Sequence, residues 1–499
     1  MSYATVFKEL DLRLKPQDLF YRVKDTGPLI FLDSSLPSRY SRYSYLGWDP
    51  VITFTSYGLK NRVCSKSEPG YTAYQHPLRF LDSFLARYID KESKNFYLSR
   101  KNKIRKIPWT FSLPSFKGGF MGYFSYDLKN YIEKLPQSAA DHYCMPLIYL
   151  VQFRHLAAYS HRKKRWYCIK NFQKRHWPKI CSAMEREAGF IEGLGQGSKD
   201  VGSSILARYR EKDYGNIELQ SNFSKKEYME AVRQAKEYIT AGDIYQVNLS
   251  QRFTCDAPIE PEDFYYILRE VNAAPFSAFI KGDDFCVASS SPERFIFCSQ
   301  DSIQTRPIKG TRPRGHNILQ DYKYSRQLKH SIKDRAELNM IVDLERNDLG
   351  KFCDYGSVKV SGHAVIEMYA RVIHSVSTVT GKMKNKVTVA DIIKAAFPGG
   401  SITGAPKIRA MQIIDQLEPC TRGVYTGSIG YISIDGTMDL NIAIRTLIVK
   451  NNCYYFNVGG GIVADSDPES EYLETLDKGK AIENSFNFFE SENLRKKDL

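Results

Sequence analysis

The sequence predicts an α+β protein in which antiparallel β-sheets pack face to face with helices on the outside. Short runs rich in Val, Ile, Tyr and Phe, separated by Gly, Pro and Ser clusters, fill the first 180 residues and indicate strands. Helical and strand spacing alternate in the second half, and no repeat of roughly 20 to 50 residues is present. This mixed order, with long antiparallel-looking runs, favours the α+β class over a doubly wound Rossmann sheet.

The chain is long and hydrophobic enough to fold around a substantial core. Its 499 residues are 42% hydrophobic, 13% aromatic and 25% charged. At about 150 residues per domain, this length corresponds to roughly two to four domains, or to two large intertwined ones. Such a composition excludes a disordered or fibrous chain and favours a globular enzyme.

The first elements in chain order are strands, followed by a linker. The runs 147–153 and 166–169 predict two of the N-terminal strands. The stretch 189–204, which contains Gly-Leu-Gly-Gln-Gly-Ser, predicts a linker by its composition. We therefore divide the chain into an N-terminal domain (1–195), a linker (196–220), a second domain that carries the chemistry (221–487) and a charged C-terminal tail (488–499).

The second domain begins with a helix and a strand. Ser224 and Glu227 have the spacing of a capping box, and apolar residues continue at helical spacing until Gly242 ends the helix. A strand is expected at 244–253, directly after this helix. Further strands are expected at 285–289, 303–307, 357–360, 428–433 and 454–458, and further helices at 322–343, from Thr388, and at 407–417.

The net charge of +15 belongs to the first 200 residues. They hold 33 Lys and Arg against 17 Asp and Glu, whereas residues 201–499 hold 38 against 39. The densest basic runs, at 100–106 and 162–165, could bind a polyanion, so a polyanion-binding protein is an alternative function class. No nucleic-acid-binding motif accompanies the charge. We favour a solvated basic face and expect no nucleic-acid partner.

The sequence indicates neither a cysteine-based metal site nor a membrane segment. The ten cysteines are scattered without a pair two or four residues apart, which is typical of reduced cysteines in the cytoplasm. The chain does not open with a signal peptide, and no apolar stretch approaches the roughly 18 residues that a membrane helix needs. We therefore expect a cytoplasmic protein without a membrane partner.

Two pairs of carboxylates have the spacing of one helix face. Asp334 and Glu337 are three residues apart, and so are Glu471 and Glu474, which follow an Asp-Ser-Asp-Pro turn. If the pairs converged, they would form an oxygen-only site of the kind that Mg²⁺ prefers. On spacing alone, two solvated helix faces are the simpler interpretation, because such pairs are common.

Two glycine-rich segments allow a ligand to approach the backbone closely. The turn 397–407, Phe-Pro-Gly-Gly-Ser-Ile-Thr-Gly-Ala-Pro-Lys, enters a helix, where free N–H groups can bind an anion. Gly459, Gly460 and Gly461 follow a strand and leave space for a ligand. A structural turn and a bulge are equally good interpretations of these two segments.

Lys309 lies among three arginines, Arg306, Arg312 and Arg314, in the segment 305–315. A lysine becomes a nucleophile when burial or neighbouring cations lower its pKa from about 10.4. Anion binding by the whole cluster is the competing interpretation, and the residues alone favour it.

Taken together, these segments resemble the chorismate-utilising enzymes. The similarity covers about 223–486 and includes Ser-Ser-Ser-Pro-Glu-Arg-Phe at 289–295, Met-Ile-Val-Asp-Leu-Glu-Arg-Asn-Asp-Leu-Gly at 340–350, His-Ser-Val-Ser at 374–377 and the glycine-rich turn. The N-terminal half resembles the anthranilate synthase component I family through Phe-Leu-Asp-Ser at 31–34 and Arg-Tyr-Ser-Tyr-Leu-Gly at 42–47. The resemblance implies the chorismate-utilising enzyme fold, which agrees with the α+β class predicted above.

Gln246 and Lys309 are two of the three positions that select a branch of this family. Members that use water resemble one another in a lysine in the strand here read as 242–250, whereas this chain has Gln246, which implies a branch that uses ammonia. Anthranilate synthases typically have Ala where this chain has Lys309 in Pro-Ile-Lys-Gly-Thr, and the lysine version is similar to the aminodeoxychorismate synthase component I branch. That branch makes 4-amino-4-deoxychorismate from chorismate and ammonia, for para-aminobenzoate and folate. Anthranilate synthase component I, of tryptophan biosynthesis, is the alternative activity.

The resemblance also implies roles for individual residues. It implies Lys309 as the nucleophile at C2 of chorismate, Glu293 as the general acid for the 4-hydroxyl group, and His374 as a residue near the ring. The substrate contacts that it implies are Gly310, Thr311, Tyr425, Arg445, Gly459, Gly460, Gly461 and Lys478. The implied cofactor is Mg²⁺, held by Glu337 and Glu474 with Asp334 and Glu471 as outer partners.

Two further features of the resemblance concern partners. Some family members hold tryptophan in the N-terminal half, and the matching positions are Ser34, Tyr40, Ser41, Arg42, Tyr43, Pro275, Phe276 and Ser277. Asp33 stands where the anthranilate branch usually has Glu. No Gly-x-Cys-x-Gly segment surrounds any cysteine. The resemblance therefore implies a separate glutamine amidotransferase subunit as the source of ammonia.

Overall fold

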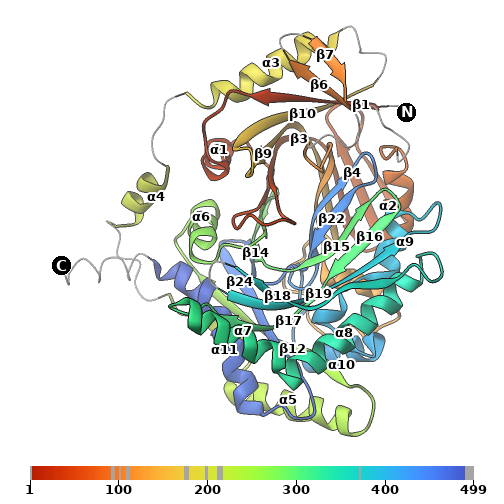
Figure 1. Ribbon diagram of the computed structural model, residues 1–499, viewed down its shortest axis with the longest axis vertical. Helices are drawn as coiled ribbons and strands as arrows, with labels where there is room; N and C mark the ends of the chain where they lie inside the picture. Colours follow the sequence, from red (N-terminus) through yellow and green to blue (C-terminus); the bar gives the residue numbers. More distant parts are fainter. Residues whose placement is uncertain are drawn as a thin grey trace.

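The computed structural model describes residues 3–90, 96–100, 103–107, 113–173, 179–196, 201–210, 217–369 and 372–488. Its architecture rests on two β-sheets that share two long strands, β3 (Tyr43–Tyr57) and β9 (Ile148–Ser160) (Figure 1). These strands pair antiparallel along almost their whole length, with a register shift after Pro50. A register shift of this kind bends a strand, and one end of each strand thereby serves one sheet and the other end serves the second.

The first sheet runs in the order β7-β6-β1-β10-β9-β3-β2-β13-β14-β23-β24-β12, and β11 and β20 also pair with β12. The pair β1 and β6 is parallel, and the other pairs named here are antiparallel. Its further strands are β1 (Tyr3–Leu10), β2 (Leu29–Asp33), β6 (Phe96–Arg100), β7 (Lys103–Lys106), β10 (Arg165–Gln173), β11 (Gln220–Ser221), β12 (Gln246–Asp256), β13 (Phe276–Lys281), β14 (Phe285–Ser291), β20 (Gly404–Ala405), β23 (Thr446–Lys450) and β24 (Cys453–Ile462).

The second sheet runs in the order β5-β4-β3-β9-β8-β21-β22-β15-β16-β19, and β17 and β18 also pair with β19. Its further strands are β4 (Lys60–Ser65), β5 (Tyr71–Tyr74), β8 (Gly119–Phe124), β15 (Arg294–Ser299), β16 (Ser302–Arg306), β17 (Ile308–Pro313), β18 (Lys359–Met368), β19 (Val372–Lys382), β21 (Ser428–Ser433) and β22 (Met438–Asn441).

The two sheets pack face to face around one apolar core, as the sequence predicted. Residues of the first sheet, such as Ile30 and Val287, belong to the same buried cluster as Tyr123 and Ile429 of the second sheet. Their neighbours along each strand point to the opposite face, because successive side chains of a strand alternate. The alternating apolar pattern of the N-terminal strands therefore contributes one layer to this sandwich.

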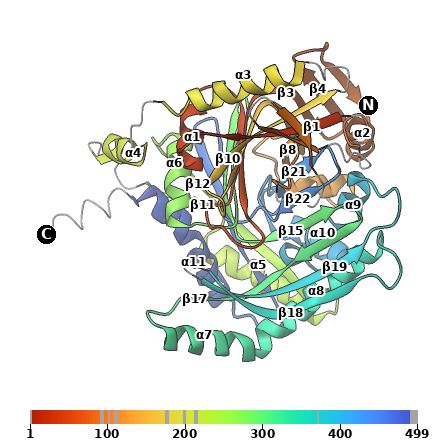
Figure 2. The ribbon, with the colours of Figure 1, turned by 45° about the horizontal axis from the view of Figure 1, so that its top comes forward.

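Helices cover the outer faces of both sheets (Figure 1 and Figure 2). One apolar cluster joins α1, α3, α4, α6 and α11 to the first sheet, a second joins α2, α8 and α9 to the second sheet, and a third joins α5 and α10 to β12. The α-helices are α1 (Pro16–Val23), α2 (Pro77–Leu85), α3 (Ile180–Gly193), α4 (Val201–Arg210), α5 (Lys225–Thr240), α6 (Pro261–Val271), α7 (Ile318–His330), α8 (Ile332–Gly350), α9 (Val389–Ala396), α10 (Lys407–Leu417) and α11 (Pro468–Phe486). Two short 3-10 helices are η1 (Tyr126–Tyr131) and η3 (Gly400–Ile402).

The two halves of the sequence share their sheets. The N-terminal strand β2 pairs with β13, and β8 pairs with β21, so strands from both sides of the range 196–220 alternate in space. Within that range lies α4, and α3 continues through Gly189, where a linker was predicted. Gly189 has no atom within 4 Å of where its Cβ would lie, so a Cβ at this helix position would meet no neighbour. The predicted tail at 488–499 lies outside the described residues except for Phe488.

The predicted helix at 322–343 is wrong in its bounds, because two helices occupy this region. The first, α7, ends at His330, and Ser331 has the extended backbone of an N-cap (φ −64°, ψ 113°). The Ser331 hydroxyl accepts the N–H of Asp334 and thereby starts α8. This break turns α8, so that its first turn reaches the cavity described below.

Other elements agree with the predictions. The capping box of Ser224 and Glu227 starts α5, with the hydroxyl accepting the N3 N–H and the carboxylate accepting the N-cap N–H. The predicted strands lie within or overlap β9, β10, β12, β14, β16, β18, β21 and β24. Among the described residues, no helix combines the length and the apolar composition that crossing a bilayer requires.

Candidate active site

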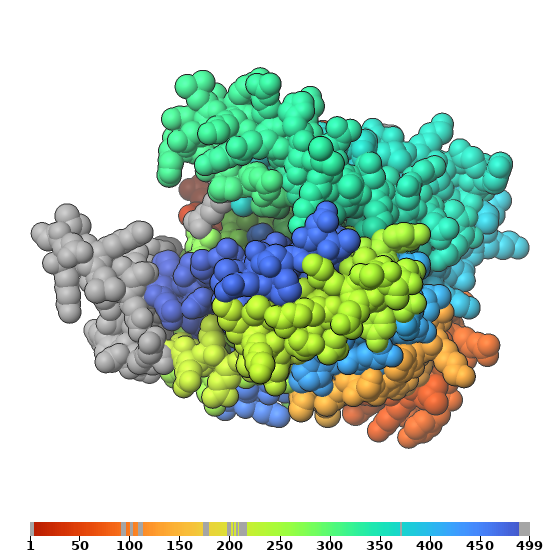
Figure 3. Space-filling model, turned by 90° about the horizontal axis from the view of Figure 1, so that it is seen from below, coloured from red at the N-terminus to blue at the C-terminus, as the bar shows by residue number. Residues whose placement is uncertain are grey.

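A cavity of about 620 Å³ lies between strands β12, β17 and β24 and helices α8 and α11. Figure 3 shows this side of the molecule, with α8 in teal and α11 in blue on either side of a hollow. All the residues to which the resemblance gave a catalytic, substrate or metal role line this cavity, apart from Gly460. They are Glu293, Lys309, Gly310, Thr311, Asp334, Glu337, His374, Tyr425, Arg445, Gly459, Gly461, Glu471, Glu474 and Lys478.

Glu293, between β14 and β15, and Lys309, on β17, line the same cavity. Glu293 precedes β15 and is only 5% exposed, and its Oε1 lies 3.4 Å from the N–H of Ile308, which donates to it. Burial raises the pKa of Glu293 to about 7. Burial also lowers the pKa of Lys309 from its usual value, although Glu337, 3.9 Å away, opposes the shift. The carboxyl group thus keeps its proton to a higher pH than a free carboxyl group, and the amine loses its proton more easily than that of a free lysine.

Arg445 supplies an unpaired positive charge to this cavity. It lies between β22 and β23 with φ 51°, and its guanidinium donates from Nη1 to Oδ1 of Asn272 at 3.2 Å. Burial lowers its pKa, and no carboxylate of the described residues forms an ion pair with it. A buried guanidinium without an anionic partner is expensive, so this position is suited to the carboxylate of a ligand.

His374 is a neutral imidazole in this environment. It is 2% exposed on β19, and its Nδ1 lies 2.9 Å from the Thr311 hydroxyl across the β17–β19 ladder. Burial lowers the pKa of His374 to about 3, and the nearby Arg445 acts in the same direction. His374 therefore fixes the Thr311 hydroxyl and can contact a ring, but it cannot carry a positive charge near neutral pH.

Four carboxylates from α8 and α11 line the cavity, so the two i, i+3 pairs converge rather than forming the solvated helix faces that their spacing alone favoured. Asp334 pairs with Arg312 at 3.1 Å, and Glu471 accepts the Ser466 hydroxyl at 2.6 Å, so both already have a protein partner. Although burial acts to raise it, Lys478, at 2.7 Å, and other lysines hold the pKa of Glu474 below its usual range. Within the described ranges, no group of three or more His, Cys, Asp and Glu side chains converges as a metal cage.

The carboxylates of the cavity suit Mg²⁺ better than a metal ion that is coordinated by protein ligands alone. Mg²⁺ keeps several waters and binds through one or two carboxylates together with an anionic substrate. Glu337 and Glu474 line the cavity from α8 and α11. The carboxylate of Glu337 lies 3.9 Å from Nζ of Lys309. Two carboxylates of this kind are consistent with a magnesium ion that also needs a ligand carboxylate.

The glycines of the cavity wall are there because side chains would not fit. A Cβ on Gly461 would lie 2.3 Å from Nε2 of Gln246 and 3.6 Å from Nζ of Lys309. A Cβ on Gly310, where φ is +77°, would lie 2.6 Å from Leu328. Gly460 lies behind the wall, and a Cβ there would lie 3.2 Å from Oε2 of Glu471. A side chain at Gly461 or Gly310 would therefore have to displace a neighbouring side chain, and at Gly310 it would also have to adopt a positive φ.

The arginines around Lys309 do not form a free anion site. Arg312 pairs with Asp334 at 3.1 Å, Arg314 pairs with Asp321 at 2.6 Å, and Arg306 pairs with a carboxylate of β18 at 2.6 Å. Three ion pairs therefore neutralise the cluster for which anion binding was the favoured interpretation. Lys309 lines the cavity, and among the described residues its Nζ forms an ion pair with Glu337 at 3.9 Å.

Several cavity residues escaped the sequence prediction. Asn248 and Asn457 come from the facing strands β12 and β24, and Ser401 and Ile402 come from the glycine-rich turn, so that turn contributes side chains to the wall. Lys333 and Ser331 line the cavity at the start of α8. A Ser followed by Asp three residues later is a helix-start signal, and it could have identified Ser331.

A buried ion pair supports the wall formed by Asn248. Arg422 donates to both carboxylate oxygens of Glu418, at 2.9 and 2.7 Å, and to the carbonyl oxygens of Asn248 and Ile402, at 2.7 and 3.0 Å. Arg422 is 1% exposed. The spacing of Glu418 and Arg422, i and i+4, was the available signal for this pair.

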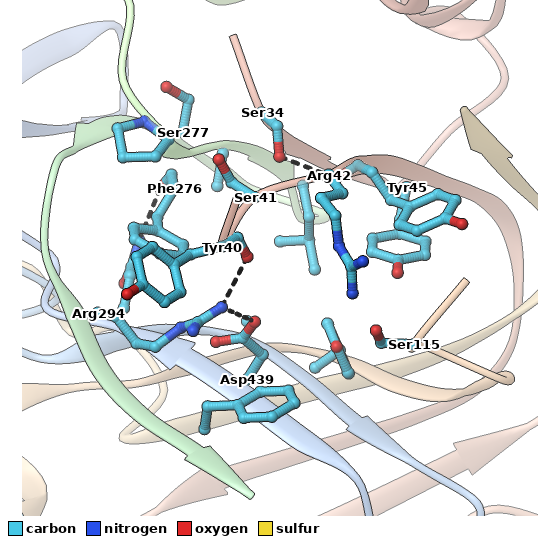
Figure 4. Close-up of a pocket in the computed structure, with 18 of the residues that line it drawn as sticks. Ser34, Tyr40, Ser41, Arg42, Tyr45, Ser115, Phe276, Ser277, Arg294 and Asp439 are labelled. Carbon is cyan, nitrogen blue, oxygen red and sulfur yellow. Dashed lines mark hydrogen bonds and ion pairs between the residues drawn. The ribbon is translucent and has the colours of Figure 1, made fainter. Parts of the chain in front are cut away.

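A second cavity of about 280 Å³ lies on the N-terminal side of the sandwich (Figure 4). All the residues that the resemblance associated with tryptophan line it: Ser34, Tyr40, Ser41, Arg42, Tyr43, Pro275, Phe276 and Ser277. Arg294 joins two parts of its wall, since it donates to the Tyr40 carbonyl at 2.8 Å and pairs with Asp439 at 2.8 Å. Asp33 also lines this cavity, and its carboxylate forms an ion pair with Arg269 at 2.9 Å.

Comparisons with known proteins identify the family of this chain. A model of the chorismate binding enzyme family matches residues 36–484. Aminodeoxychorismate synthase component 1 of Escherichia coli is 40% identical over 89% of each chain, and anthranilate synthase component 1 of Aquifex aeolicus is 34% identical over 94% of this chain and 91% of its own. The structure of anthranilate synthase component I from Streptococcus pneumoniae superposes with a TM-score of 0.74 at 28% identity, covering 90% of this chain and 93% of that one. The chain belongs to the chorismate binding enzyme family.

Proposed function

We propose that this protein is an aminodeoxychorismate synthase component 1, which converts chorismate and ammonia to 4-amino-4-deoxychorismate for para-aminobenzoate and folate biosynthesis. The observation that carries the proposal is Lys309, buried in the cavity at the position where anthranilate synthases typically have Ala. The relatives support the same choice, since the proteins with this name in Escherichia coli and Bacillus subtilis are 40% and 34% identical to this chain.

In the first half of the proposed reaction, Lys309 and Glu293 act together. The neutral Nζ of Lys309 forms a bond to C2 of chorismate, the ring double bonds shift, and the C4–O bond breaks. Glu293 gives its proton to the departing hydroxyl group, which leaves as water. This step needs a neutral amine and a protonated carboxyl group, and both the lowered pKa of Lys309 and the pKa of about 7 of Glu293 are shifted toward these states.

In the second half, ammonia forms a bond to C4 and the C2–N bond to Lys309 breaks. The carboxylate of Glu293, which gave up its proton in the first half, recovers a proton from the new ammonium group. The sum is chorismate plus ammonia giving 4-amino-4-deoxychorismate and water, with the enolpyruvyl group retained. Holding the ring on Lys309 between the two halves keeps the substrate in place while ammonia enters.

The remaining residues of the cavity bind and orient the substrate. Arg445, which lines the cavity, would hold the enolpyruvyl carboxylate through two parallel N–H···O bonds. Thr311, fixed by His374, and Tyr425 contact the ring, while the glycines of β24 allow it to lie against the backbone. Lys478, which donates to the Gly459 carbonyl at 2.9 Å, adds positive charge on the α11 side.

Glu337 and Glu474 would hold Mg²⁺, with Asp334 and Glu471 as outer partners. The ion would supply positive charge to the ring carboxylate of chorismate. Without it, the four carboxylates would repel that group, so the chain's own residues favour a magnesium-dependent enzyme.

Ammonia comes from a separate glutaminase subunit in this proposal. The sequence has no Gly-x-Cys-x-Gly segment, and the name component 1 of the relatives implies a second component. All ten cysteines are free, in keeping with a cytoplasmic enzyme.

We also propose that the second cavity holds tryptophan, because Tyr40 and Phe276 give it aromatic walls and Asp439 gives it a carboxylate.

A product assay tests the proposed function. Purified protein is incubated with chorismate, Mg²⁺ and ammonium, and products are separated by chromatography while pyruvate is measured enzymatically. The expected product is 4-amino-4-deoxychorismate without pyruvate. Prompt release of pyruvate together with anthranilate would instead identify an anthranilate synthase. Adding glutamine without a partner subunit should give no product.

A further inference from the structure

The orientation of Arg445 depends on two residues outside the cavity wall. Its backbone lies in the left-handed region, at φ 51°, and its carbonyl oxygen accepts the N–H of Ser290 at 3.0 Å. Its guanidinium makes one hydrogen bond within the described part of the chain, from Nη1 to Oδ1 of Asn272 at 3.2 Å. One side-chain bond therefore fixes the plane of a group that has to meet a planar carboxylate.

Asn272 is itself held firmly. It caps the C-terminus of α6, and its N–H donates to the Leu268 carbonyl at 2.8 Å. Its own carbonyl oxygen accepts the hydroxyl of Ser290, the residue that also holds the backbone of Arg445. Ser290 is fully buried on β14. Asn272, Ser290 and Arg445 thus form a cluster that joins α6, β14 and the approach to β23.

The amide oxygen of Asn272 orients the guanidinium of Arg445 without neutralising its charge, which a carboxylate oxygen could not do. It accepts one N–H of the guanidinium and fixes its direction, yet it adds no negative charge. A carboxylate would form an ion pair with Arg445 and compete with the carboxylate of a substrate for the same donors. The Nδ2 of Asn272 is buried with no acceptor among the described residues, so within them the side chain forms its hydrogen bond through the oxygen.

We propose that Asn272 is a positioning residue, which aims Arg445 at the substrate carboxylate while leaving its charge free. This proposal rests on the proposed function, since it assigns the carboxylate of chorismate to Arg445. Asn272 contacts no reacting atom in this account, and it acts only through the guanidinium. Its removal should therefore change substrate affinity much more than the rate of the chemical steps.

Two variants of Asn272 separate its effect on the orientation of Arg445 from the effect of its having no charge. Asn272→Ala removes the bond, and a lost hydrogen bond to a charged group should weaken chorismate binding about tenfold. Asn272→Asp keeps the bond but neutralises Arg445, so binding should weaken about a hundredfold while the melting temperature stays equal to or above that of the wild type. Both should leave kcat within about threefold, because the chemistry at Lys309 and Glu293 is unchanged.

The measurements are KM and kcat with ammonium and Mg²⁺, and the Kd of chorismate by calorimetry without ammonia. Matched controls are Asn484→Ala and Asn484→Asp on the exposed face of α11, which should change none of these values. In an Arg445→Ala background, Asn272→Ala should alter Kd by less than about twofold, because the two residues act as one unit.

Unchanged affinity in both Asn272 variants, or an equal further loss in the Arg445→Ala background, would overturn the proposal. A lower melting temperature for Asn272→Asp together with wild-type affinity would overturn it as well. Failure of the wild-type protein to bind chorismate is a separate outcome, which would refute the proposed function rather than the contact between Asn272 and Arg445.

Discussion

The ionisation of Glu293 provides a prediction in which activity and stability change in opposite directions. Burial raises the pKa of this carboxyl group from 4.5 to about 7, so the folded protein keeps the proton that the unfolded chain has already lost. Stability from this group is fully present below pH 4.5 and is lost as the pH rises to about 7. Replacement by Gln removes the charge and keeps the shape.

The size of the effect follows from the shift. A difference of about 2.5 pKa units corresponds to about 3 kcal/mol of destabilisation of the wild type at pH 8, and to less than about 1 kcal/mol at pH 5. The Glu293→Gln variant should therefore gain about 2 to 3 kcal/mol on the wild type between pH 5 and pH 8. Its kcat should fall by about a hundred- to ten-thousandfold, because the general acid is gone.

Urea unfolding at the two pH values, followed by tryptophan fluorescence, measures the stability difference, and the ammonia-dependent assay measures kcat. Glu483→Gln, on the exposed face of α11, is the matched control and should show neither effect. An equal stability difference at pH 5 and pH 8 would refute the raised pKa. Near-wild-type activity of Glu293→Gln would refute its role as the proton donor.

Three further outcomes are expected. Lys309→Ala should lower kcat/KM by at least about a hundredfold, with any remaining turnover releasing pyruvate and anthranilate in the product assay; undiminished aminodeoxychorismate formation would count against the lysine. Treatment with EDTA should abolish activity, and added Mg²⁺ should restore it. Glu337→Gln should raise the Mg²⁺ concentration for half-maximal rate about tenfold, whereas Asp343→Asn, at an exposed position, should leave that concentration unchanged. Calorimetry should detect tryptophan binding that weakens about tenfold in Tyr40→Ala, and the absence of heat with the wild type would exclude tryptophan from the second cavity.

The sequence was sufficient to predict most of the reactive groups of the cavity. Lys309, Glu293 and Arg445 were identified through short segments whose order along the chain resembles a known family, and the structure brings them to one cavity. The carboxylate pairs illustrate the limit of spacing alone. Two pairs at i, i+3 were compatible with solvated faces, and only the packing of α8 and α11 around one hollow brings them together.

Features that depend on distant contacts could not be predicted. The pairing of β2 with β13 joins residues about 250 positions apart, and nothing in a local pattern specifies such a partner. The hydrogen bond from Arg445 to Asn272 spans 173 positions for the same reason. The break between α7 and α8 differs from these, because Ser331 and Asp334 form a local start signal that the apolar spacing concealed.

The most direct test of the account is whether chorismate becomes bound to Lys309. The protein is mixed with chorismate and Mg²⁺ in the absence of ammonia, quenched in acid, digested and analysed by peptide mass spectrometry. The account predicts that the peptide containing Lys309 gains the mass of chorismate less one water, and that ammonium added before quenching removes this gain. Turnover of chorismate with ammonium but without any adduct on Lys309 would contradict the account.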